Sequence, residues 1–143
     1  EDQNYKNKML RKITDANLEK RILFLGKKPF EDLPKLFQGM SVVAALSRNE
    51  GYGLTPLEGM ASGAAVLTSS EGVWGELVRD GIDGYVVKTN DVFQTSERLN
   101  TLIENSSKTK IMGENAAKYI SENFSVEKEA EQIIQHIRYV QNI

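Results

Sequence analysis

The segment that decides the fold is Leu46-Ser47-Arg48-Asn49-Glu50-Gly51-Tyr52-Gly53-Leu54-Thr55-Pro56-Leu57-Glu58-Gly59-Met60-Ala61-Ser62-Gly63. Short apolar runs flank it, over residues 41–46 and 64–68, and such runs are typical of buried strands. Between them lie a glycine-rich loop and, at Thr55-Pro56, the expected start of a helix. A strand, a glycine loop and a helix in this order predict an anion site, because backbone N–H groups and the helix dipole point at the loop.

Elsewhere in the chain, short apolar runs alternate with helical patterns. Apolar spacing predicts helices over residues 5–16, 31–38, 92–103 and 107–123 and from Ser125 to about Val140, with one turn of helix at 74–78. Runs at residues 22–25 and 85–87 add two strands, the first closed by Gly26 and expected to be buried on both faces. The fold class predicted is therefore α/β, a Rossmann-like parallel sheet with flanking helices.

Three details of these helices are also predicted. Asn90 or Asp91 is expected to cap the helix that begins near residue 92. Thr55 is expected to be the N-cap of the helix that carries Glu58. The apolar stripe of the last helix is expected to pack on the sheet or on a domain outside this chain.

Composition limits the classes of protein that fit. The chain has 143 residues, 40% of them hydrophobic and 27% charged, which is ordinary for one soluble domain. A net charge of −2 argues against a nucleic-acid partner, and the absence of cysteine excludes disulfides and cysteine metal sites. No run approaches 18 apolar residues, so no transmembrane segment is expected, and a cytoplasmic location is consistent with these features. Because no initiating methionine is present, the chain is expected to be a piece of a longer protein.

The two carboxylates of the central segment, Glu50 and Glu58, suggest a partner for the anion site. A carboxylate beside a phosphate is unfavourable unless it accepts hydrogen bonds, and sugar hydroxyls supply them. The residues alone leave other interpretations open. Glu58 could close a capping box with Thr55, and Glu50 could be an ordinary solvated carboxylate. On these grounds the segment predicts binding of a polyhydroxylated anion.

Four other side chains are interpreted structurally. His136, the single histidine, is expected on the surface of the last helix. Trp74 is expected to pack the turn that follows Gly72 rather than to meet a ligand. Asp80 and Asp83 are interpreted as turn residues, because their spacing lacks the ligand series of a calcium loop.

The central segment resembles a known family signature. The run from Glu50 to Glu58, continued by Gly59-Met60-Ala61-Ser62-Gly63, resembles the Glu-x7-Glu motif of retaining GT-B glycosyltransferases of family 4. The resemblance continues through Gly72-Val73-Trp74-Gly75-Glu76 and in the tail at Glu122-Asn123-Phe124-Ser125. It covers nearly the whole chain, which would then be the donor nucleotide-sugar-binding C-terminal domain over 1–143, in part, with the N-terminal acceptor domain outside it.

The resemblance implies roles for particular residues. Glu50 would be the catalytic residue that contacts the donor sugar, and Glu58 would hold the ribose hydroxyls. Further donor contacts are implied in the loop and beside the base, at Gly51, Tyr52, Gly53, Leu54, Thr55, Gly26 and Lys27. The reaction would retain the anomeric configuration by front-face displacement, with the leaving phosphate accepting the acceptor's proton. No metal and no cofactor are expected beyond the nucleotide-sugar substrate.

The donor and acceptor are implied less directly. Thr55-Pro56 resembles the variant found in lipopolysaccharide-core mannosyltransferases, which implies GDP-mannose as donor and a glycan or lipid-linked glycan as acceptor. A UDP-hexose donor stays open, as does a non-catalytic sugar-nucleotide-binding module. A flavodoxin-like signalling domain would need an acidic cluster at the end of the first strand, where Gly26-Lys27 is basic. The family's phosphate-binding Arg and Lys lie upstream of residue 1, so this piece alone is expected to be inactive. Peripheral association of the full enzyme with the inner face of the membrane also stays open.

Overall fold

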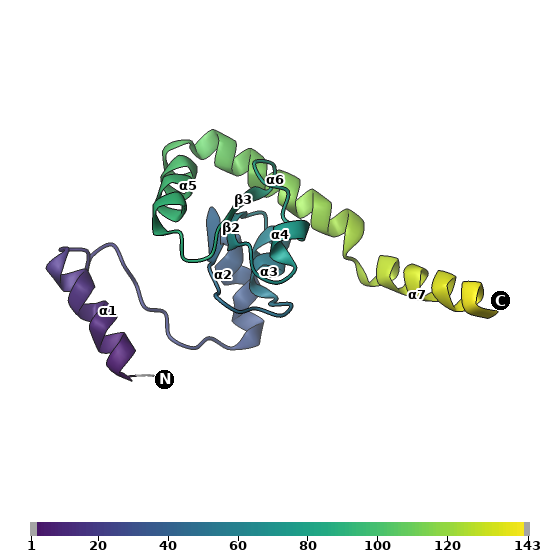
Figure 1. Cartoon of the computed structure of the whole chain (residues 1–143), viewed down its shortest axis with the longest axis horizontal. Coiled ribbons are helices and arrows are strands. Elements are labelled where there is room, and N and C mark those ends of the chain that lie inside the picture. The colour runs from purple at the N-terminus through teal and green to yellow at the C-terminus, as the bar shows by residue number, and fades with distance from the viewer. Residues whose placement is uncertain (1–2, 142–143) are drawn as a thin grey trace. The chain divides into compact units, whose positions relative to one another are not determined.

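The computed structural model describes residues 3–141 and divides the chain into two units, Glu1–Glu31 and Asp32–Ile143. In the first unit, α1 spans Gln3–Asp15 (Figure 1). The chain leaves this helix through Asn17, whose φ of 55° lies in the left-handed region that asparagine tolerates better than most residues. The helix predicted over residues 5–16 is therefore confirmed, with a start two residues earlier.

The strand predicted over residues 22–25 is wrong in this structure. These residues have no regular secondary structure, and their four apolar side chains are 39–79% exposed. A strand needs a neighbour that accepts and donates its backbone hydrogen bonds. Within residues 3–141, none of the strands pairs with this run, so apolar character alone does not order it.

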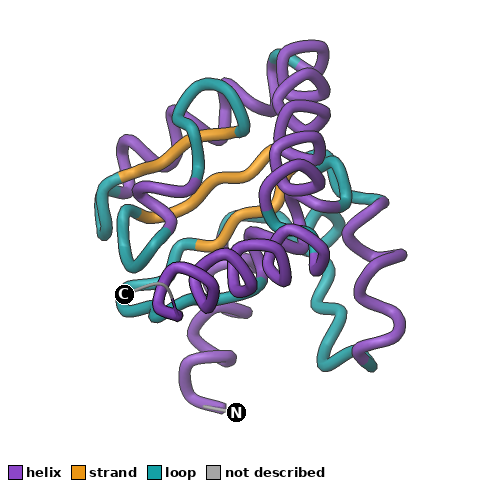
Figure 2. Tube along the Cα trace, turned by 90° about the vertical axis from the view of Figure 1, so that its right-hand side faces the viewer, coloured by secondary structure: helices purple, strands orange, loops and turns teal. Residues whose placement is uncertain are grey.

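The second unit is built on three parallel strands, which Figure 2 shows side by side. They are β1 (Val42–Ala45), β2 (Ala65–Ser69) and β3 (Gly84–Val87), in the order β1-β2-β3. Val43 pairs with Val66, and Leu67 pairs with Tyr85. The three remaining strand predictions are confirmed, and the central strand β2 is buried along its whole length.

Helices connect and follow the strands (Figure 1). A 3-10 turn, η1, at Phe30–Asp32 leads into α2 at Leu33–Gln38. The others are α3 (Thr55–Ala61), α4 (Trp74–Leu77), α5 (Val92–Glu104), α6 (Ser106–Asn123) and α7 (Val126–Gln141). Asp91 is the cap of α5 and accepts a hydrogen bond from the Gln94 N–H, as predicted.

Side chains that alternate along β2 divide the core into two clusters. Even-numbered residues of the β2 segment, such as Val66, face a cluster that includes Met60 of α3 and Trp74 of α4. Odd-numbered residues such as Leu67 face a cluster that includes Leu102 of α5. α6 contributes to both clusters, through Ala116 and Met112 respectively. Helices therefore cover both faces of the sheet, which is the doubly wound arrangement expected from the sequence.

The last helix differs from the others. No residue of α7 is buried, and five apolar side chains along it are 48–77% exposed: Val126, Ile133, Ile134, Ile137 and Val140. The sheet therefore does not cover this stripe, and packing on the sheet, one of the two predicted arrangements, is wrong. His136 is exposed on the same helix, as predicted. Within residues 3–141, no helix combines the length and the apolar character needed to cross a bilayer.

Candidate functional site

The Glu-x7-Glu segment begins at the carboxyl end of β1. Because the three strands are parallel, the residues that follow β2 and β3 emerge at the same edge of the sheet. Two of these loops are joined directly, since the Thr89 Oγ1 donates a 2.6 Å hydrogen bond to Glu71 Oε1. The loop after β1 therefore lies at the carboxyl edge of a parallel sheet, as predicted for it.

Glu50 is half-buried and is held by neighbours in its own loop. Ser47 Oγ donates a 3.0 Å hydrogen bond to Glu50 Oε2. On another side lies Gly53, where an added Cβ would stand 2.6 Å from Glu50 Cδ and 2.9 Å from Oε1. Gly53 has a φ of 44°, so it reverses the chain in a conformation that side chains resist. The Glu50 carboxylate is therefore packed and is not freely solvated.

The turn after β2 packs against the backbone of the loop that carries Glu50. Gly72 has a φ of 59°, and a Cβ there would lie 2.4 Å from the Glu50 carbonyl oxygen and 2.7 Å from that of Gly51. Only glycine allows the two segments to approach so closely. This turn, which resembles the family pattern in sequence, therefore packs against the backbone of Glu50 in the structure.

The start of α3 corrects the predicted cap. Leu54 has helical dihedral angles of φ −84° and ψ −19° and is the N-cap, with no side-chain hydrogen bond. Thr55 is already the first helical residue, so the capping box of Thr55 with Glu58 does not form. The left-handed turn at Gly53 delivers the chain into the helix one residue early. Pro56 falls in the first turn, where its missing N–H is tolerated.

Glu58 lies in the first turn of α3, and only its backbone is engaged. Its N–H donates a 2.9 Å hydrogen bond to the Leu54 carbonyl. The half-buried carboxylate accepts no hydrogen bond from the residues that the structure describes. The carboxylate is therefore available to a ligand, and its predicted contact with ribose stays a prediction.

The remaining predicted donor contacts fall in two places. Gly51, Tyr52, Leu54 and Thr55 are exposed along the loop and the helix start, next to Glu50. Gly26 and Lys27 belong to the first unit, and their contact with the base stays a prediction. In the part of the chain from residue 3 to residue 141, no group of three His, Asp or Glu side chains could hold a metal ion.

The ring of Tyr52, in the loop, lies next to the ring of Trp74 in the core. Trp74 is 1% exposed, and its ring centroid lies 6.3 Å from that of Tyr52 at an interplanar angle of 52°. Burial of Trp74 agrees with the packing role predicted for it. Tyr52 remains 51% exposed and borders an open groove of about 810 Å³ with residues of α3, α6 and α7: Leu54, Leu57, Tyr119, Asn123, Phe124, Glu129 and Gln132.

Several supporting contacts were not evident from the sequence. Ser69 Oγ donates a 2.7 Å hydrogen bond to the Ser47 carbonyl, and only the pairing of β1 with β2 brings them together. Asp83, predicted as a turn residue, is fully buried and accepts two side-chain hydrogen bonds from Arg79, at 2.6 and 2.8 Å. The hydrogen bond that Arg79 donates to Asp83 raises the pKa of Arg79, whose guanidinium also lies 4.3 Å over the Tyr119 ring. This ion pair holds the turn into β3.

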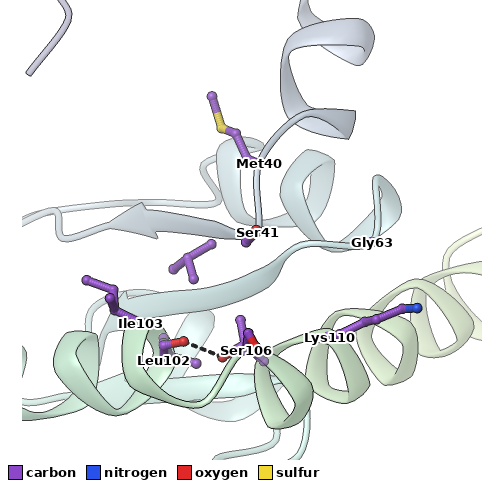
Figure 3. Close-up of a pocket in the computed structure, with 9 residues that line it drawn as sticks. Met40, Ser41, Gly63, Leu102, Ile103, Ser106 and Lys110 are labelled. Carbon is purple, nitrogen blue, oxygen red and sulfur yellow. Dashed lines mark hydrogen bonds between the residues drawn. The ribbon is translucent and has the colours of Figure 1, made fainter. Parts of the chain in front are cut away.

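A second cavity, of about 540 Å³, has no residue of 46–58 in its lining. Figure 3 shows this cavity. Its walls come from the starts of β1 and β2 and from α5 and α6: Met40, Ser41, Val42, Gly63, Leu102, Ile103, Ser106, Thr109 and Lys110. Thr109 Oγ1 donates a 2.6 Å hydrogen bond there to the Leu102 carbonyl. Because Ser41 and Gly63 precede their strands, this cavity opens at the amino edge of the sheet and is not part of the glutamate site.

Known proteins resemble this chain in fold and in sequence. The lipopolysaccharide core biosynthesis mannosyltransferase LpcC of Rhizobium leguminosarum bv. viciae is 37% identical over 129 residues, covering 90% of this chain and 36% of the relative. The C-terminal domain of LpcC, a glycosyl transferase group 1 family protein from Francisella tularensis, has a TM-score of 0.82 at 28% identity, over 87% of this chain and 65% of that structure. HepE from Anabaena, solved in complex with UDP, has a TM-score of 0.86 at 30% identity, over 96% of this chain and 37% of HepE.

The chain spans about a third of the length of the curated relatives it matches. The sequence model of the family "Glycosyl transferases group 1" matches residues 2–119, well over half of the chain. This chain therefore belongs to the glycosyl transferase group 1 (GT4) family and has the fold of the C-terminal domain of its GT-B members.

Proposed function

We propose that this chain is the donor-binding part of a retaining glycosyltransferase that transfers a hexose, with GDP-mannose as the donor. The observation that carries the proposal is the state of the Glu50 carboxylate. One of its oxygens is fixed by Ser47, while the other lies beside the turn at Gly53 at the carboxyl edge of the sheet. This is where a doubly wound fold binds its ligand.

Each residue of the site has a task in this proposal. The Glu50 carboxylate accepts a hydrogen bond from a hydroxyl of the donor sugar, since an ionised carboxylate only accepts. Backbone groups of residues 51–55 contact the sugar and the diphosphate, and Glu58 accepts hydrogen bonds from the ribose hydroxyls. For Gly26 and Lys27, which belong to the first unit, contact with the base stays a prediction from the resemblance. The Glu58 carboxylate accepts no hydrogen bond from the described residues, and this supports its role. A carboxylate that was buried or engaged in a capping box could not accept hydrogen bonds from ribose.

The reaction in this proposal is the one that the family resemblance implies. The bond between the anomeric carbon and the diphosphate oxygen breaks, and the acceptor oxygen forms the new glycosidic bond on the same face of the sugar. The acceptor's proton passes to the departing diphosphate oxygen, so the protein supplies no separate base. Positive charge develops on the sugar ring, and the preorganised Glu50 carboxylate stabilises it. No metal is required to balance these steps.

Mannose is the sugar best supported by the relatives. LpcC of Rhizobium, at 37% identity, is named a lipopolysaccharide core biosynthesis mannosyltransferase. The acceptor in this proposal is accordingly a lipopolysaccharide core or a similar glycan. A UDP-hexose donor is the second candidate, and it is favoured by the likeness to HepE. The structure of HepE with UDP-glucose matches this chain with a TM-score of 0.83 at 29% identity.

The whole protein in this proposal is longer than the chain. Residues 1–143 form part of its C-terminal domain, and an acceptor-binding domain and the Arg and Lys that bind the donor phosphates precede residue 1. The isolated chain accordingly binds nucleotide weakly and transfers no sugar. The full enzyme works in the cytoplasm and meets a lipid-linked acceptor at the membrane surface.

A transfer assay with the full-length protein tests this proposal. The protein is incubated with a lipopolysaccharide core acceptor and either GDP-mannose or UDP-glucose, and the glycan product is analysed by mass spectrometry. We expect a mannosylated product with GDP-mannose, and competition by GDP stronger than by UDP. Transfer from UDP-glucose alone would replace the donor assignment. Nucleotide binding without transfer from any sugar nucleotide would instead indicate a non-catalytic binding module.

A further inference from the structure

We infer that Ser47 is a positioning residue that fixes the Glu50 carboxylate for the donor sugar, and that Ser69 anchors Ser47 to the sheet. The inference rests on the proposed function, because it gives Glu50 a ligand to meet. It adds two residues that lie outside the Glu-x7-Glu motif. Neither is expected to touch the donor.

The first step is the contact between Ser47 and Glu50. Ser47 Oγ donates to Glu50 Oε2 at 3.0 Å, three residues along the same loop. Oε1 accepts no hydrogen bond among the residues described, and it lies close to Gly53. The two oxygens of one carboxylate therefore have different surroundings. Ser47 occupies one of them and leaves the other for a hydroxyl of the sugar.

The second step is the anchor of Ser47 itself. Ser69 is the last residue of β2, it is 3% exposed, and its Oγ donates to the Ser47 carbonyl at 2.7 Å. β2 is the central strand and pairs with both neighbours, so the backbone at its end is held in position. A hydrogen bond from this point sets the backbone of Ser47, and Ser47 then sets the carboxylate. The chain of contacts runs from the sheet to the catalytic group.

The third step is that the Glu50 side chain has little room to move on the sides that Ser47 does not contact. Gly53 closes in on the carboxylate, and Gly72 packs against the carbonyl of Glu50. Because of these neighbours, a Glu50 side chain that loses the hydrogen bond from Ser47 has few other positions available. In most of them the carboxylate turns away from the sugar. A misplacement of about 1 Å at a reacting group can lower a rate by about 100-fold. We expect about a 10-fold effect, because these neighbours remain.

A purely structural role for Ser47 makes a different prediction. Serine hydroxyls often stabilise turns by bonding to nearby groups, and removal of such a bond weakens the loop as a whole. In that case nucleotide affinity, melting temperature and rate would fall together. A positioning role lowers kcat while the affinity for free nucleotide stays constant, since the diphosphate contacts lie on the backbone of other residues.

The test uses the full-length protein with three changes at position 47. Ser47→Ala removes the donor, Ser47→Cys keeps its size with a weak donor, and Ser47→Thr keeps the hydroxyl. We expect kcat to fall about 10-fold in the Ala and Cys variants and to recover to within about 3-fold of wild type in the Thr variant, with donor KM and nucleotide Kd within about 2-fold. Should the Ala variant not fold, the Cys variant gives the same comparison.

Ser121→Ala is the matched control. Ser121 is an exposed serine of α6 whose hydroxyl also donates one hydrogen bond, at 2.8 Å to the Lys118 carbonyl. This variant should keep wild-type kcat and Kd. Ser69→Ala should lower kcat in the same direction as Ser47→Ala, by a smaller factor. Full kcat in both Ser47→Ala and Ser47→Cys would overturn the inference, and so would a parallel loss of kcat and nucleotide affinity.

A double-mutant cycle with Glu50→Gln separates this inference from the proposed function. If Ser47 acts through Glu50, Ser47→Ala adds no further loss of kcat to Glu50→Gln. If the two losses multiply, the positioning role fails while the catalytic role of Glu50 stands. If Glu50→Gln itself keeps wild-type turnover, the catalytic role of Glu50 fails, and with it the positioning role of Ser47. If the wild-type protein transfers no sugar from any sugar nucleotide, the proposed function fails.

Discussion

The loop that carries Glu50 and the helix turn that carries Glu58 hold their carboxylates in different ways. Glu50 is bonded by Ser47 and bounded by Gly53, and its backbone is backed by Gly72. Glu58 is fixed through its backbone alone, and its carboxylate accepts no hydrogen bond among the residues described. The difference suggests a division of labour, because a group at a reaction centre needs one geometry whereas a group that binds flexible hydroxyls can adapt.

Replacing Glu50 should give the largest effect. In the full-length enzyme, Glu50→Gln should lower kcat by about 10²–10³-fold, because a preorganised charge at the developing transition state is lost. Donor KM should change by no more than about 3-fold, which steady-state kinetics would show. Glu114→Gln is a suitable control, since Glu114 is an exposed residue of α6 paired only loosely with Lys110, at 3.9 Å. A loss of affinity with little change in kcat would reverse the roles given to the two glutamates.

Replacing Gly72, which packs against the backbone of Glu50, tests whether this turn supports the Glu50 loop. Gly72→Ala adds a Cβ 2.4 Å from the Glu50 carbonyl oxygen, in a backbone conformation with φ 59°. Gly81→Ala is the matched control, because its φ of 77° gives similar strain while its Cβ meets nothing within 4 Å. We expect urea denaturation to give a loss of about 1–2 kcal/mol for Gly81→Ala from strain alone. Gly72→Ala should lose about 1–3 kcal/mol more from the collision. Equal losses would mean that the turn does not support the loop.

Replacing Glu58 should have a smaller effect, on binding rather than on rate. Glu58→Ala should weaken nucleotide affinity by about 10-fold, which corresponds to about 1.4 kcal/mol, while kcat at saturating donor stays near wild type. Calorimetric titration would measure this loss. A 2′-deoxy nucleotide sharpens the result, because it should bind wild type more weakly than the ribonucleotide and show no such difference in Glu58→Ala. If the variant still discriminates the two nucleotides, Glu58 does not hold the 2′-hydroxyl.

Glu127 in the first turn of α7 should give the smallest effect. A hydrogen bond from its own backbone N–H, then one from Ser125, lower its pKa from 4.5. A carboxylate whose pKa is lowered by folding stabilises the helix above pH 4.5, and this contribution is lost as the pH falls through the lowered value. Amide chemical shifts in the first turn of α7 should therefore change as the pH falls, and the change should be smaller in Glu127→Gln. A pH-independent α7 would contradict this.

The sequence predicted the folded elements well wherever the partner of each element lies within the second unit. Residues 22–25 and Val42–Ala45 are both four-residue apolar runs, yet only the second forms a strand, because β2 pairs with it. Apolar character can be read from the sequence, but a hydrogen-bonded neighbour cannot. Thr55 shows the same limit on a smaller scale. Its type favours a cap, and the turn at Gly53 shifts the helix start past it.

Of the candidate site, the sequence predicted the loop and its two glutamates but not what holds them. Ser47 lies three residues before Glu50, and this spacing alone gives no reason to single it out. Ser69 is 22 residues farther along the chain and meets Ser47 only through the register of β1 and β2. Glu71 and Thr89 are likewise joined only by the folded edge of the sheet. Motifs in sequence reveal the groups that meet a ligand, whereas the supporting contacts depend on tertiary structure.

The most direct test of the central claim is a titration of the ¹⁵N-labelled 143-residue chain, followed by NMR. Added GDP-mannose, to about 10 mM so that weak binding is detected, should shift the backbone amides of residues 51–55 and of Glu58, and leave those around Ser121 unchanged. The shifts should shrink in Glu58→Ala at the same ligand concentration. Unchanged amides at residues 51–55 with GDP-mannose, UDP-glucose and the free nucleotides would contradict the assignment of this loop as the donor site.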